Sequence, residues 1–239
     1  MSWPRKLGLG QNGADEPVVI ALGWNARGTL WQAYRRAAET GGGLAQLVDI
    51  LNGIRPGIAV QILAHSLGAR VALSTLPHLE PGQVRRIILL AAAELRSRAA
   101  ACLECRGGRG VEVLNVRSGE NAFFDRMMEW LVAPHASGDR SLAQGLARPS
   151  ARWIDLTVDD ASTRAALLAL GYTIPAPDRQ VCHWSVYLRS GLFDVYRAVF
   201  AQELTFYSLA LHLPRAAPQP RRRCTFRRVP LPLLRRGAS

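Results

Sequence analysis

Short apolar runs alternate along the chain with longer stretches whose apolar residues recur at helical spacing. The runs that predict buried strands span residues 17–22, 58–64, 84–91 and 111–116, and residues 153–158 predict a strand with alternating apolar and polar positions. The stretches that predict helices span residues 29–39, 44–54, 67–79, 123–132, 161–170 and 191–211. Strands that alternate with helices predict an α/β fold, in which a mostly parallel sheet is flanked by helices.

Glycine and proline residues divide the pattern further. The run Gly41-Gly42-Gly43 is expected to separate the first two helices, and Pro56-Gly57 to end the second. With 239 residues, the chain is long enough for one α/β domain, which we expect over residues 1–213. Residues 214–239 are rich in proline and arginine and are expected to form a basic tail with little structure of its own.

The most informative stretch joins the strand predicted over 58–64 to the helix that follows it. It reads Ala64-His65-Ser66-Leu67-Gly68. A strand that runs directly into a small-x-Ser-x-Gly turn and then a helix is typical of a nucleophile elbow, which exposes the serine hydroxyl above the carboxyl edge of the sheet. Small residues are needed two positions before and after the serine, and Ala64 and Gly68 meet that need. The N–H of Leu67, at the start of the helix, is expected to stabilise an oxyanion.

This stretch, with its flanking strand and helix, resembles the nucleophile elbow of the α/β-hydrolase superfamily, in the variant with alanine at the first position. The similar order of elements extends from about residue 17 to residue 200. The resemblance implies that Ser66 is the nucleophile and that an acid and then a histidine follow along the chain. His183 lies late, in a loop before a helix, and is expected to be the general base. His65, next to the serine, is expected to point elsewhere.

The triad acid is expected in the loop after the strand predicted over 111–116. The position that the resemblance assigns to the acid holds Asn121, which can orient an imidazole but cannot stabilise an imidazolium as a carboxylate does. Glu120 is therefore the predicted acid, with Asp125 as the second choice. Other carboxylates remain open as alternatives: Glu94, Asp159 and Asp160.

Two interpretations of the apolar run 17–22 remain open. In the first, it is the strand that carries the oxyanion loop, and the N–H of Trp24 is the second oxyanion donor. In the second, it is the strand just before the elbow strand, so the earlier strands and the usual oxyanion loop are absent from this chain. The 41 residues from Pro17 to Ile58 suit a single strand–helix–strand crossover, which favours the second interpretation.

Composition and charge narrow the possible partners. Apolar residues make up 49% of the chain and charged residues 20%, as in an ordinary soluble domain. The net charge is +12, but eight arginines and no acids fall within residues 215–239. The charge therefore does not indicate specific nucleic-acid binding over the fold. The basic tail is expected to be solvated, and the alternative that it binds nucleic acid or an anionic membrane surface remains open. No apolar stretch is long enough for a transmembrane helix, and no apolar segment of a signal peptide follows Arg5-Lys6, so we expect a cytoplasmic protein.

Neither a metal nor a cofactor is expected. Cys102 and Cys105 form a single CxxC without a second pair, which is a weak metal or redox signal. A phosphate-binding GxxxxGK[ST] loop does not occur in the sequence.

The functional hypothesis is a serine hydrolase that cleaves an ester or related acyl bond in a small molecule through an acyl-enzyme on Ser66. The tryptophans Trp24, Trp31 and Trp184 suggest an apolar substrate. The alternative is a non-catalytic or N-terminally truncated relative that acts as a binding module. Asn121 in the acid position and the missing front strands favour that alternative.

Overall fold

The computed structural model describes residues 2–9, 17–132, 137–146 and 150–214. Its sheet has four parallel strands in the order in which they occur along the chain. These are β1 (Val60–His65), β2 (Val84–Leu90), β3 (Glu112–Arg117) and β4 (Trp153–Thr157). The predicted α/β fold with a parallel sheet flanked by helices is therefore confirmed.

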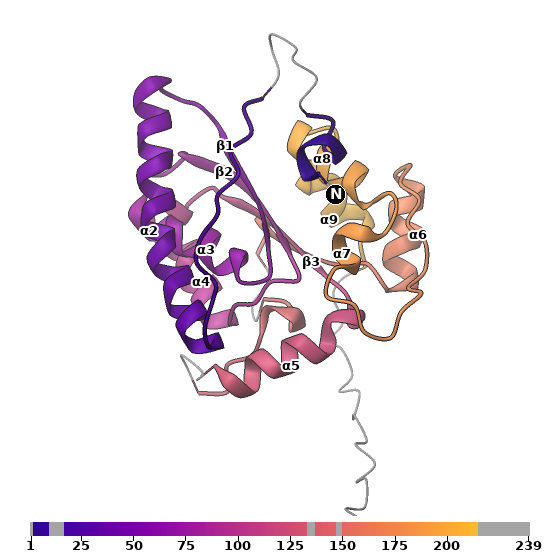
Figure 1. Ribbon diagram of the computed structural model, residues 1–239. Helices are drawn as coiled ribbons and strands as arrows, with labels where there is room; N and C mark the ends of the chain where they lie inside the picture. Colours follow the sequence, from indigo (N-terminus) through magenta and orange to yellow (C-terminus); the bar gives the residue numbers. More distant parts are fainter. Residues whose placement is uncertain (1, 10–16, 133–136, 147–149, 215–239) are drawn as a thin grey trace, which may run out of the picture.

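Helices cover both faces of this sheet. They are α1 (Trp3–Lys6), α2 (Leu30–Ile54), α3 (Gly68–Thr75), α4 (Arg96–Glu104), α5 (Ala122–Leu131), α6 (Ala161–Ala169), α7 (Ser185–Leu188), α8 (Leu192–Ala201) and α9 (Phe206–His212). Figure 1 shows α2, α3 and α4 on one side of the sheet and α6 to α9 on the other. Helix α5 runs across the carboxyl ends of the strands, which is the edge where β1 meets α3.

The core consists of two apolar layers, one on each face of the sheet. Successive side chains of a strand point to opposite faces. In β2, Ile87 and Leu89 accordingly pack with residues of α2, α3 and α4, whereas Ile88 and Leu90 pack with residues of α8 and α9. All four are fully buried. This two-sided burial is why the strand reads as a continuous apolar run.

The strand predicted over residues 17–22 is wrong. This segment has no strand structure, and Val18, Val19, Ile20 and Leu22 are exposed. A strand needs backbone hydrogen bonds to a neighbour, and residues 17–22 do not pair with β1, the edge strand, whose partner among the described residues is β2. Apolar composition made the segment look like a strand, but composition does not supply a pairing partner.

The two helices predicted on either side of Gly41-Gly42-Gly43 are one continuous helix, α2, of 25 residues. It begins with a capping box, in which the Thr29 side chain accepts from the N–H of Gln32 and the Gln32 side chain from the N–H of Thr29. Gly41 is buried where α2 crosses α3, and a β-carbon at this position would lie 2.7 Å from both the carbonyl carbon and the Cβ of Ser74. The glycine permits close helix packing and does not break the helix.

Two other expectations near the ends of elements also differ. The stretch 191–211, predicted as one helix, is divided into α8 and α9, because Gln202 takes a left-handed backbone (φ 64°) that ends α8. Thr205 then caps α9 by accepting from the N–H of Ser208. Helix α4 forms between the strands predicted over 84–91 and 111–116, where the sequence pattern predicted no helix.

The close contact at Gly41 predicts opposite effects for two neighbouring glycines. Gly41→Ala should lower the free energy of unfolding by about 1–3 kcal/mol, since the added methyl overpacks the α2–α3 contact. Gly43→Ala should raise it by about 0.5–1 kcal/mol, because that position is exposed with open space around it and alanine favours the helix. Urea unfolding measures both. Equal stabilisation by the two substitutions would contradict the packing at Gly41.

Candidate active site

Ser66 lies at the junction of β1 and α3 with a left-handed backbone conformation, φ 54°. A non-glycine residue in this region is strained by about 1–3 kcal/mol and persists only when its surroundings hold it. Two backbone hydrogen bonds do so: the Ser66 N–H donates to the carbonyl of Leu90 (2.9 Å), and the N–H of Ala93 donates to the carbonyl of Ser66 (3.0 Å). The expected strand–Ser–helix turn is therefore present, with the half-buried serine at the carboxyl edge of the sheet.

The backbone just after the serine suits an oxyanion. Within the described part of the chain, the N–H of Leu67 donates to no other group. It lies at the N-cap position of α3, where helix N–H groups and the helix dipole favour negative charge. Gly68 follows without crowding, since a β-carbon there would lie 3.8 Å from the Cβ of Ala64.

His183 lies beside the elbow because His65 holds its loop. The His65 Nε2–H donates to the carbonyl oxygen of His183 (3.0 Å), and the two ring centroids are 4.5 Å apart. The expectation that His65 would point away from the site is wrong: it joins β1 to the loop that carries the predicted base. The Ser66 hydroxyl makes no hydrogen bond to any described residue, so the structure does not show the Ser66–His183 bond that a general base requires.

Burial keeps the His183 imidazole neutral. Burial and, to a smaller extent, the neighbouring His65 together lower the pKa of His183 to about 4. The Phe124 ring lies on the imidazole with its centroid 4.5 Å away. A neutral imidazole at neutral pH is the form that can accept a proton.

Asn121 is the residue that contacts this imidazole. It lies in the turn after β3, is 3% exposed, and its Oδ1 is 2.6 Å from His183 Nδ1. Its Nδ2 donates to Asp125 Oδ1 at 2.7 Å. Asp125 is half-buried, and its pKa is raised to about 7 mainly by burial. His183, Asn121 and Asp125 therefore form a continuous hydrogen-bonded chain.

Glu120, the acid predicted from the sequence, does not contact the imidazole. Its buried carboxylate binds Arg189 (2.8 Å) and the N–H of Arg179 (2.9 Å), while its carbonyl accepts from the N–H of Cys182 (2.8 Å). Burial alone would raise the pKa of Glu120, but the hydrogen bonds from Ser185, Arg179 and Arg189 lower it below its usual value. Glu120 thus anchors the loop that carries His183.

The other carboxylates left open by the sequence also have partners elsewhere. Glu94 is ion-paired with Arg70 (2.6 Å) in the layer beneath α2. Asp159 binds Arg189 (2.8 Å), and Asp160 caps α6. Asp125, the second choice, reaches the imidazole only through Asn121. The four-residue spacing of Asn121 and Asp125, typical of hydrogen-bonded side chains on a helix, was the signal in the sequence for this pair.

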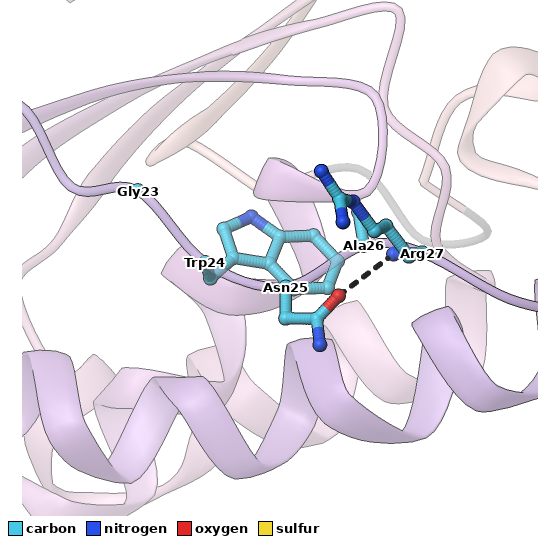
Figure 2. Close-up of a pocket in the computed structure, with 5 residues that line it drawn as sticks. All are labelled: Gly23, Trp24, Asn25, Ala26 and Arg27. Atoms are coloured by element: carbon cyan, nitrogen blue, oxygen red, sulfur yellow. Dashed lines mark hydrogen bonds between the residues drawn. The ribbon is translucent and has the colours of Figure 1, made fainter.

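Trp24, the predicted second oxyanion donor, lies on the exposed segment before α2. Figure 2 shows it in a shallow depression lined only by the five consecutive residues 23–27, in which the Asn25 side chain accepts from the N–H of Arg27 (3.0 Å). Ser66 and His183 do not line this depression. The role of Trp24 stays a prediction.

The single CxxC lies at the end of α4. Cys105 donates to the carbonyl of Cys102 (2.9 Å), and burial raises the pKa of the Cys102 thiol to about 12, so the thiol stays protonated. Within the described ranges, no three His, Cys, Asp or Glu side chains come together as metal ligands. The basic tail from residue 215, which includes Cys224, lies outside the described residues.

Comparison of the chain with protein-family models, curated proteins and solved structures found no match. The resemblance to the α/β-hydrolase superfamily therefore rests on the residues of the elbow and on the order of the elements. None of the described helices is both long and apolar enough to cross a membrane.

Proposed function

We propose that this protein is a serine hydrolase of the α/β-hydrolase type that cleaves an ester or related acyl bond. The observation that carries the proposal is the left-handed Ser66 between a parallel strand and a helix, one residue from the His65 side chain that holds the loop of His183. Strained backbone at such a position is a feature of functional sites. The neutral imidazole and the free Leu67 N–H are the other two parts that acyl transfer needs.

The proposed reaction has two steps. His183 Nε2 takes the proton of Ser66 as Oγ bonds to the substrate carbonyl carbon, and the imidazolium returns that proton to the leaving alcohol as the ester C–O bond breaks. Water then loses a proton to His183 and attacks the acyl-enzyme. The proton returns to Ser66 Oγ when the acid departs. The Leu67 N–H stabilises the oxyanion in both steps.

Apolar side chains around the base support an apolar acyl group as the substrate. Phe124 lies on the imidazole, and the ring centroid of Trp184, which is 52% exposed, is 6.5 Å from it. Phe123, 58% exposed, lies on the first turn of α5 close to Asn121. Exposed aromatic residues beside a reactive centre provide surface that an acyl chain can cover.

Labelling with a fluorophosphonate probe tests the proposal. The full chain is expected to bind the probe covalently, because an activated serine attacks phosphorus as it attacks a carbonyl carbon. Ser66→Ala should abolish labelling, while Ser190→Ala, which removes an exposed hydroxyl from the loop between α7 and α8, should leave it unchanged. Labelling is read by intact mass.

Absence of labelling in a chain that melts cooperatively would contradict the proposal. It would favour the second candidate, a non-catalytic binding module of the same fold. The observation behind that candidate is Asn121, a neutral residue on the imidazole where a hydrolase carries an acid.

A further inference from the structure

The Asn121 amide has two ends of nearly equal shape, an oxygen that accepts and a nitrogen that donates. If the nitrogen faced His183, Nδ1 would have to accept, and the imidazole proton would sit on Nε2, where it blocks the uptake of the serine proton. In serine triads, an amide in place of the acid lowers kcat by about 10⁴-fold because the imidazole takes this wrong tautomer. An asparagine at this position is therefore compatible with base catalysis only if its orientation is fixed.

Asp125 is placed to fix that orientation. It lies one helical turn after Asn121, and its Oδ1 accepts from Asn121 Nδ2 at 2.7 Å. An ionised carboxylate can only accept hydrogen bonds, so the amide nitrogen must face Asp125 and the amide oxygen must face His183. The 2.6 Å contact between Asn121 Oδ1 and His183 Nδ1 is then a bond donated by Nδ1–H.

We propose that Asp125 is a positioning residue that sets the tautomer of His183 through Asn121, with the proton on Nδ1 and the lone pair on Nε2. The catalytic meaning of this inference rests on the proposed hydrolase function, but the tautomer itself does not. Glu120 is not part of this hydrogen-bonded chain, because its carboxylate binds Arg189.

The surroundings of Asp125 set the pH above which it is ionised and can take this role. Burial raises the pKa of Asp125, the hydrogen bond from Asn121 lowers it, and the charges of Glu129 and Arg117 raise and lower it respectively, so that the pKa lies at about 7. Above this pKa the carboxylate is ionised and accepts only. On the imidazole side, the titratable neighbour is His65, which donates from Nε2 to the His183 carbonyl.

The test uses the full chain labelled with ¹⁵N-histidine, because the two neutral tautomers give distinct nitrogen shifts. Above the pKa of Asp125, wild-type His183 is expected as the Nδ1–H tautomer, and His65 as the Nε2–H tautomer provides an internal reference. Asp125→Asn frees the Asn121 amide to rotate and should move His183 toward Nε2–H. It should also lower kcat/KM on the order of 10²-fold, less than a wrong tautomer in every molecule would.

A double substitution separates positioning from a merely structural role. Asn121→Asp with Asp125→Asn places a carboxylate directly on Nδ1, where the amide introduced at position 125 donates to it. This variant should restore the Nδ1–H tautomer and reach at least the wild-type kcat/KM. Glu129→Gln is the control, because it changes a charge near Asp125 without touching Asn121; its own bonds go to the N–H of Ser141 and to Gln144. It should leave the tautomer unchanged.

A folded Asp125→Asn protein that keeps both the Nδ1–H tautomer and the wild-type rate would overturn the inference. If Asp125→Asn does not fold, the double variant tests the inference instead. A folded double variant whose His183 is the Nε2–H tautomer would also overturn the inference. The spectra need no substrate. A tautomer that follows Asp125 in a protein without esterase activity would therefore support the positioning role while contradicting the hydrolase.

Discussion

Ser66→Ala and His183→Ala are each expected to lower kcat/KM for an activated ester on the order of 10⁴-fold. The serine supplies the atom that bonds to the acyl carbon, and the imidazole removes its proton, so neither group works without the other. The double variant should therefore be about as slow as either single one, since groups that act as a unit are far from additive. Hydrolysis of a p-nitrophenyl ester measures all three.

A control variant and two outcomes test whether the loss comes from catalysis by Ser66 and His183. His78→Ala, which removes an exposed histidine at the end of the 3₁₀ turn after α3, is the control for His183 and should leave the rate unchanged. Multiplying losses in the double variant would mean that the two residues do not act in one step. Wild-type hydrolysis no faster than that of Ser66→Ala would remove the catalytic proposal altogether.

Arg70→Met is expected to lower the free energy of unfolding by about 3–5 kcal/mol. Arg70 and Glu94 are 5% and 1% exposed and form an ion pair at 2.6 Å between α3 and the connection from β2 to α4. The same arginine donates to the carbonyl of Tyr34 (2.7 Å) and lies over its ring, and the Tyr34 hydroxyl donates to Glu94. Without the arginine, the Glu94 carboxylate stays buried without its cation, and α2 loses a contact to α3.

Urea unfolding measures this loss against two controls. Arg70→Met with Glu94→Gln removes the unpaired charge and should recover part of the stability. Arg35→Met removes an exposed ion pair to Glu39 within α2 and should cost no more than about 0.5 kcal/mol. A loss for Arg70→Met as small as that for Arg35→Met would contradict a buried, structurally required pair.

Local sequence patterns were sufficient to predict the strands of the sheet and the strand–Ser66–helix turn. The strands β1 to β4 were predicted to within two residues at each end, because each has a short apolar or alternating pattern of strand length; β2 and β3 are buried on both faces. The elbow was predictable because its requirements lie within five residues: a strand, small residues around Ser66 and a helix. The left-handed φ of Ser66 agrees with that expectation.

Contacts between segments distant in the sequence decided the rest. Residues 17–22 have strand composition but do not pair with the edge strand β1, and the glycines of α2 suggest a break until Ser74 is seen against Gly41. Likewise, Glu120 and Asn121 are adjacent, and the choice between them depends on Arg189 and His183, more than 60 residues away. The sequence by itself determined the fold class and the nucleophile candidate, since both depend on local patterns. Only the tertiary structure decided the partner of the imidazole, because neighbouring side chains on a turn point in different directions and the burial of a charge depends on what packs against it.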